Sequence, residues 1–233
     1  MENEKICLDK SIVSFLCNVY FGEDEDIERS IQRAYLDFNR TIAFNNEHKE
    51  MQGDSKEEKK NKLKKRSDLR DKALHKIKAF IEEKLLTIEC QDAFDTEHKV
   101  LCRDISEIYK SKTCISHKKR EINPDGLYYG QAQKWVNMTL KYLYVLDKCK
   151  GGIQYDNVVS LFHVPVDNII LNEPDENVHV ERIRKEKESW STWDYNTYMS
   201  YREKLEEQIK TRYGEDKAPL IWEIENWVPK KNT

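Results

Sequence analysis

The chain has 233 residues, of which 36% are charged and 38% hydrophobic, and its formal net charge is −3. It contains no stretch of about 18 apolar residues, so the sequence predicts no membrane span and no membrane partner. Glycine and proline are scarce, while lysine and glutamate are abundant, which favours helices. The apolar content is sufficient for one domain, or two closely packed lobes, around a real core.

The six cysteines show no metal-ligating pattern. They contain no CxxC pair, no zinc-finger spacing and no compact group that could hold an iron–sulfur cluster. We therefore expect reduced, mostly buried thiols, no metal and no cofactor, in a cytoplasmic protein. The first segment, MENEKICLDK, lacks the basic-then-apolar layout of a signal peptide, which favours the same location.

Hydrophobic periodicity predicts helices along most of the chain. Residues 8–21 place Ile12, Phe15, Leu16 and Val19 on one stripe, and residues 26–44 repeat the pattern. No convincing strand pattern is present, so the predicted fold class is all-α. Further helices are expected at 56–86, 92–110, 131–147, 155–162, 168–173, 189–213 and from Pro219 onward, with loops at 45–56 and 116–126.

Charge is unevenly distributed along this series. Residues 56–78, KEEKKNKLKKRSDLRDKALHKIK, hold eleven Lys/Arg against four Asp/Glu, a local charge of +7. Such a run is either the solvated face of a helix or a surface that follows a phosphate backbone. The sequence leaves both interpretations open.

The predicted helix 131–147 is apolar on nearly every side, which is typical of a helix buried on all faces. Lys134 stands in its first turn, where desolvation and the positive end of the helix dipole both favour a neutral amine. A neutral amine is a nucleophile. The alternative is that Lys134 reaches outward to solvent.

Further along, the segment HVPVD is expected to be extended up to Pro165, because residues before proline avoid the α region. Asp167 then stands where the helix 168–173 begins and can cap its free backbone N–H groups.

The order Gly130-x-Ala132-x-Lys134, an apolar helix and then Val164-Pro165-Val166-Asp167 resembles the helix–hairpin–helix DNA glycosylases. It is most similar to their lysine-bearing 8-oxoguanine branch, of the archaeal type. The resemblance covers about residues 120–171 and extends to PLIW at 219–222. It implies a single two-lobed helical domain, 1–233, with a central cleft.

The resemblance also implies roles for individual residues. Lys134 would attack the sugar C1′ of a flipped nucleotide, and Asp167 would stabilise the positive charge that develops there. Collapse of the resulting imine by β-elimination would nick the strand; water activated by Asp167 would instead give base removal alone. The hairpin backbone would hold a phosphate of double-stranded DNA, which the protein would bind as a monomer. Its residues are Gly130, Gln131, Ala132 and Gln133.

A flipped base is held by aromatic rings and polar side chains. The candidates for this contact are Trp222, Trp135, Trp190 or Trp193, the polar cluster of Asp37, Asn39 and Arg40, and His163, although His163 could instead be a hydrogen-bonded structural residue. The aspartate that the family places four residues before its pocket tryptophan would fall at Ala218. This departure leaves the identity of the base open.

Several functions fit the sequence. The first is a repair glycosylase for an oxidised base, associated with the nucleoid when bound to DNA. The second is a defence enzyme that removes bulky bases, such as hydroxymethylated or glucosylated cytosine, from phage DNA. The third is a non-catalytic DNA-binding module, and the fourth is a helical interaction protein with Lys134 in solvent.

Overall fold

The computed structural model describes residues 10–44, 55–113, 123–172, 175, 177–180 and 189–227, and the fold is all-α as predicted. Its only extended pairing within these residues is an isolated bridge between Phe44 and Thr113. No helix in the described part of the chain is long and apolar enough to cross a membrane. The helices are α1 (Lys10–Phe21), α2 (Asp26–Phe38), α4 (Lys56–Glu83), α5 (Gln91–Ile108), α6 (Tyr129–Cys149), α7 (Asn168–Leu171), α8 (Tyr195–Tyr213) and α9 (Pro219–Asn226).

Short 3₁₀ turns join several of these helices. They are η1 (Asn39–Thr41), η2 (Leu85–Thr87), η3 (Val159–Leu161) and η4 (Trp190–Thr192). The helix predicted at 189–213 is thus divided, because Trp193 is extended and Asp194 caps a new helix by accepting a bond from Thr197 N. The helix predicted at 155–162 is reduced to η3. Most of the predicted loops at 45–56 and 116–126 lie outside the described residues.

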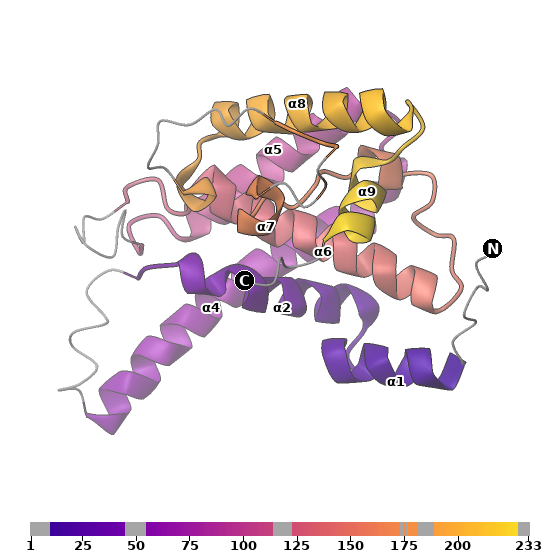
Figure 1. The fold of residues 1–233 in the computed structure, drawn as a ribbon. Coiled ribbons are helices and arrows are strands. Elements are labelled where there is room, and N and C mark those ends of the chain that lie inside the picture. The colour runs from indigo at the N-terminus through magenta and orange to yellow at the C-terminus, as the bar shows by residue number, and fades with distance from the viewer. Residues whose placement is uncertain are drawn as a thin grey trace, which may run out of the picture.

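α6 runs through the middle of the molecule, with α8 on one side and α2 and α4 on the other (Figure 1). It is buried from Gly130 to Leu143 without interruption, which confirms the prediction of a helix covered on all faces. One cluster of buried apolar residues joins α2, α4, α5 and α6. A second cluster joins the Val164–Val166 segment to α7, η4, α8 and α9. The two-lobed cleft stays a prediction.

α1 forms where the periodicity placed it, but none of its residues is buried. The predicted apolar stripe faces solvent, with Phe15 64% and Val19 68% exposed. The cysteines differ from expectation in a similar way. All four in the described ranges are free thiols, yet only Cys102 is buried, while Cys90 and Cys149 are exposed.

Candidate active site

The first turns of α6 are fixed by a close contact with η4. The Gly130 N–H donates to the Trp193 carbonyl at 3.0 Å. A Cβ at position 130 would lie 1.9 Å from the Trp190 carbonyl oxygen, so only glycine allows this approach. One turn later Lys134 is only 4% exposed, so the alternative of a lysine that reaches into solvent is excluded.

Asp167 lies at the N-terminus of α7 and uses its two carboxylate oxygens differently. Oδ1 accepts hydrogen bonds from the N–H groups of Ile169 and Ile170 at 2.8 and 3.1 Å, which is the predicted N-cap. Oδ2 accepts from Lys134 Nζ at 2.7 Å. The lysine and the aspartate, 33 residues apart in sequence, therefore form a direct ion pair.

The electrostatic setting keeps Asp167 ionised. Burial of its carboxyl opposes the charged form, but the Lys134 ammonium and the two N–H groups outweigh burial and hold the pKa of Asp167 below its usual value. The two side chains are 5% and 15% exposed. The Lys134 amine and the Asp167 carboxylate thus meet where little water can screen them.

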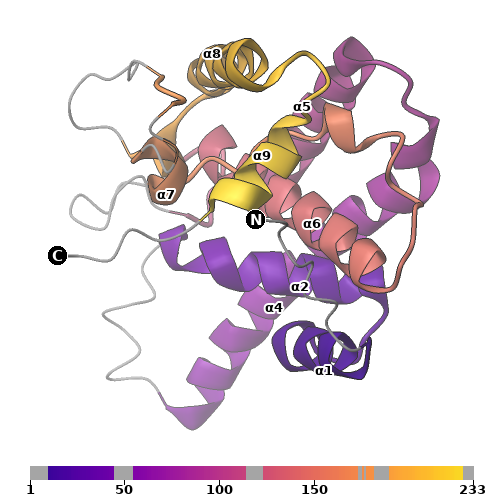
Figure 2. The ribbon, with the colours of Figure 1, turned by 45° about the vertical axis from the view of Figure 1, so that its right-hand side comes forward.

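Both members of the pair line a cavity of about 370 Å³. This is within the range of roughly 300–1,000 Å³ that is typical of ligand sites. Its lining residues include members of α2, α6 and α7, and Figure 2 labels these helices. Its lining also includes Tyr20, Arg33, Leu36, Asp37, Arg40, Met138, Tyr142, Asn168, Ile169, Trp190 and Trp227.

The end of the cavity away from Lys134 is polar. Met138 and Tyr142 follow Lys134 at helical spacing, so all three share one face of α6. The Tyr142 hydroxyl donates to Asp37 Oδ2 and lies 3.2 Å from the Tyr20 hydroxyl. The spacing from Lys134 was a signal in the sequence for Met138 and Tyr142, and it was missed.

A second buried ion pair lies behind one wall of the cavity. Lys141 Nζ donates to Glu223 Oε1 at 2.8 Å and lies 4.8 Å from the centre of the Trp227 ring. Burial raises the pKa of Glu223, and the nearby Lys141 ammonium lowers it only in part. The pair therefore supports Trp227, whose ring lines the cavity.

The prediction that Trp222 faces the base is wrong. Trp222 is 1% exposed, does not line the cavity, and donates its indole N–H to Asp175 Oδ2 at 3.0 Å. Trp227, the residue that follows the last residue of α9, lines the cavity instead. Glu223 stands four residues before Trp227, but its side chain is buried and lies outside the cavity lining.

Of the other residues predicted to bind the base, some line the cavity and others do not. Arg40 lines the cavity, whereas Asn39 does not. Trp135 is fully buried against Phe38 and donates to the Ile31 carbonyl at 3.0 Å, so it belongs to the core. His163 is also fully buried and outside the cavity lining, which supports its structural alternative.

The predicted phosphate contacts of residues 130–133 conflict with the structure. All four residues are buried, because α6 begins at Tyr129 and takes them into its first turns. The N–H groups of Gln131 and Ala132 both donate to the Tyr128 carbonyl. The Gln133 side-chain amide donates to the carbonyls of Gly130 and Val166. These N–H groups already donate hydrogen bonds within the protein, so they are not available to a phosphate.

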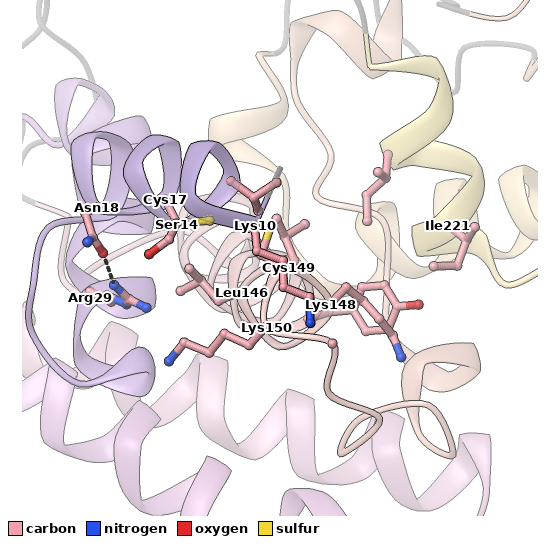
Figure 3. Close-up of a pocket in the computed structure, with 15 residues that line it drawn as sticks. Lys10, Ser14, Cys17, Asn18, Arg29, Leu146, Lys148, Cys149, Lys150 and Ile221 are labelled. Carbon is pink, nitrogen blue, oxygen red and sulfur yellow. Dashed lines mark hydrogen bonds between the residues drawn. The ribbon is translucent and has the colours of Figure 1, made fainter. Parts of the chain in front are cut away.

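A larger cavity, of about 770 Å³, lies at the opposite end of α6 between α1 and α9 (Figure 3). Cys17 of α1 and Cys149 of α6 approach each other there (Figure 3). Burial and the hydrogen bond with Cys17 raise the pKa of Cys149 to about 11, so it is a thiol rather than a reactive thiolate at neutral pH. None of the predicted site residues lines this cavity.

Comparisons of the chain with protein-family models, with curated proteins and with solved structures found no match. Within the described ranges, no group of three or more His, Cys, Asp or Glu side chains could hold a metal ion.

Proposed function

We propose that the protein is a DNA glycosylase with lyase activity, in which Lys134 is the nucleophile and Asp167 assists. The observation that carries the proposal is the 2.7 Å ion pair between these residues at the wall of a cavity of nucleotide size. An ion pair that only stabilises the fold does not require a cavity beside it. Here both charged groups line one.

The pair can supply each requirement of base excision. The Lys134 ammonium first gives a proton to Asp167 Oδ2, to which it is hydrogen bonded at 2.7 Å. The neutral nitrogen then forms a bond to the sugar C1′ while the bond from C1′ to the base breaks. The proton that the ammonium gives up passes to the departing base, so charge and protons balance. The Asp167 carboxylate stabilises the positive charge on the sugar, because it is fixed by two backbone donors and needs no reorganisation. Ring opening to an imine and β-elimination then cleave the strand on the 3′ side.

The cavity walls suit an extruded base. A flipped base is held by stacking on aromatic rings and by hydrogen bonds to its edge. Trp227 and Trp190 supply ring faces, and the Asp37–Tyr142 pair supplies a polar end. Arg33 and Arg40 in the lining are groups that favour phosphate. These contacts support duplex DNA with a modified base as the substrate.

Strand cleavage at a preformed abasic site tests the chemistry without knowledge of the base. We expect the wild-type protein to nick an abasic duplex and Lys134→Gln to lose this activity by on the order of 10³ or more. Lys148→Gln, at the far end of the same helix, is the matched control and should cleave like wild type. A wild-type protein that leaves the abasic strand intact, or a Lys134→Gln variant as active as wild type, would contradict the proposal.

The base can be identified with the same proteins. Duplexes that carry 8-oxoguanine, hydroxymethylcytosine or glucosylated hydroxymethylcytosine separate a repair substrate from a foreign-DNA substrate by which base is released. Steep, salt-dependent binding of duplex DNA by wild type without any cleavage would instead favour the non-catalytic DNA-binding module.

A further inference from the structure

The N-terminal half of α4 extends away from the rest of the molecule (Figures 1 and 2). Every buried residue of this helix lies from Ala73 onward, and residues 56–72 contain none. At 1.5 Å per residue this segment is about 25 Å long. The helix begins with a capping box between Ser55 and Glu58, which stabilises its free end without packing.

The charges of this segment are sorted around the helix. Between residues 56 and 66, five cations fall within a sector of about 160° at 3.6 residues per turn, and we call them the basic face. They are Lys56, Lys59, Lys60, Lys62 and Arg66. Glu57, Asp68 and Asp71 lie outside that sector, and Glu58 accepts hydrogen bonds from Ser55. The projecting helix therefore presents a positive side.

One end of the basic face contacts the segment that follows α2 and carries Arg40. The Arg66 guanidinium lies 4.5 Å from the centre of the Phe44 ring. Phe44 follows Arg40 by four residues, and Arg40 lines the cavity that holds Lys134. Arg66 thus contacts the chain segment that carries a cation of the cavity wall.

Three of the lysines on this face are available to an anionic partner. Lys56, Lys59 and Lys60 form no ion pair within the part of the chain that the structure describes, and Lys56 and Lys60 are exposed. A straight row of cations suits a regular row of phosphates, since duplex DNA carries one negative charge for about every 1.7 Å of its axis.

We infer that the basic face of α4 binds the phosphate backbone of duplex DNA on one side of the nucleotide that enters the cavity. The choice of DNA as partner rests on the proposed function. The surface would add affinity without reading the sequence, because phosphate contacts position a protein but carry no base information.

The test is the salt dependence of binding to a duplex that contains a tetrahydrofuran abasic-site analogue. The variant combines Lys56→Gln, Lys59→Gln and Lys60→Gln. The matched control combines Lys204→Gln, Lys210→Gln and Arg212→Gln on α8, which lies across the molecule from α4 (Figure 1). Both remove three positive charges from a helix, so a difference between them reports location rather than net charge.

We expect the α4 variant to reduce the slope of log K against log salt by up to about 2.7, or about 0.9 per lost phosphate contact. Its affinity at 50 mM salt should fall by at least about tenfold, while the α8 control should bind like wild type. An α4 variant with the wild-type slope and affinity would overturn the inference, as would an equal loss in both triple variants.

The two proposals can fail separately. A reduced slope in the α4 variant, together with no cleavage of abasic DNA by wild type, would retain the DNA-binding surface and reject the glycosylase. Cleavage by wild type, together with an unaltered slope of log K against log salt in the α4 variant, would retain the glycosylase and reject the DNA-binding surface.

Discussion

Asp167 joins a structural role to a chemical one in a single carboxylate. Oδ1 caps α7, and Oδ2 pairs with Lys134. The hydrogen bonds of the cap fix the orientation of the Asp167 carboxylate, and the carboxylate in turn fixes the position of the Lys134 amine. An asparagine at this position could still cap the helix through its side-chain oxygen, because asparagine and aspartate are about equally good N-caps. The charge and the cap can therefore be separated by one substitution.

We expect Asp167→Asn to lower the free energy of unfolding by about 3 kcal/mol, because it leaves the Lys134 ammonium buried without its partner. It should also abolish cleavage of abasic DNA. Asp194→Asn is the matched control, since exposed Asp194 caps α8 through Thr197 N at 2.8 Å without a buried ion pair. Urea unfolding of both variants measures the difference. Equal, small losses in both would show that the pair with Lys134 contributes nothing beyond the cap.

At the residue scale, the sequence predicted the contact between Lys134 and Asp167 but did not predict which tryptophan lines the cavity. The pairing of Lys134 with Asp167 was expected from the resemblance of their two motifs to those of the lysine-bearing glycosylases, not from local pattern. The choice between Trp222 and Trp227 could not be expected, because both follow the same helical pattern in a short element. Only the packing of α9 turns Trp222 toward Asp175 and leaves Trp227 at the cavity.

At the scale of one element, α9 and the residue that follows it place two tryptophans in different environments. We expect Trp227→Ala to slow excision in single-turnover kinetics by about 10–100-fold, the value of roughly 1–3 kcal/mol for one stacked base. Its stability should change little, because Trp227 is 37% exposed. Trp222→Phe should instead reduce stability, because Asp175 loses its buried indole donor. The opposite pattern, with Trp222→Phe slowing excision and Trp227→Ala destabilising, would return the pocket role to Trp222.

α5, α6 and α8 are joined by a buried polar network. His163 contacts the Tyr198 hydroxyl at 3.1 Å and Asp95 Oδ1 at 2.8 Å. His98 contacts the Tyr129 hydroxyl at 2.9 Å and Asn137 Oδ1 at 2.8 Å. Burial lowers the pKa of His163 to about 4 and that of His98 well below its usual value, so both are neutral in the folded protein.

This network predicts a loss of stability in mild acid. The unfolded chain binds protons at these histidines near pH 6.5, but folded His163 does so only near pH 4, so the free energy of unfolding falls as the pH drops between these values. From pH 7 to pH 5 the loss should be about 2 kcal/mol for each histidine.

Urea unfolding at the two pH values measures this loss. His163→Gln should remove about half of it, while His75→Gln, at an exposed position of α4, should retain it. A stability that is the same at pH 7 and pH 5 in the wild-type protein would contradict the assignment of two buried neutral histidines.

For the whole molecule, periodicity was sufficient to predict an all-α fold around α6, because a helix that is apolar on every side requires neighbours on every side. Periodicity did not predict which apolar stripes are buried against another helix. The stripe of α1 has the same spacing as a core stripe, yet Phe15 and Val19 face solvent. Burial depends on long-range packing, which a local pattern does not contain.

The distribution of charge matters more than its sum at this scale. The net charge of −3 argues weakly against a nucleic-acid partner. The structure nevertheless gathers cations along the free half of α4 and at the cavity wall. A protein that is acidic overall can bind a polyanion through such a local surface.

The measurement that tests the central claim most directly is borohydride reduction of the protein with an abasic duplex, followed by proteolysis and mass spectrometry of the adduct. The account predicts that the reduced sugar is attached to the side chain of Lys134, with trypsin no longer cleaving after that residue. An adduct on any other amine, or none at all with the wild-type protein, would contradict it.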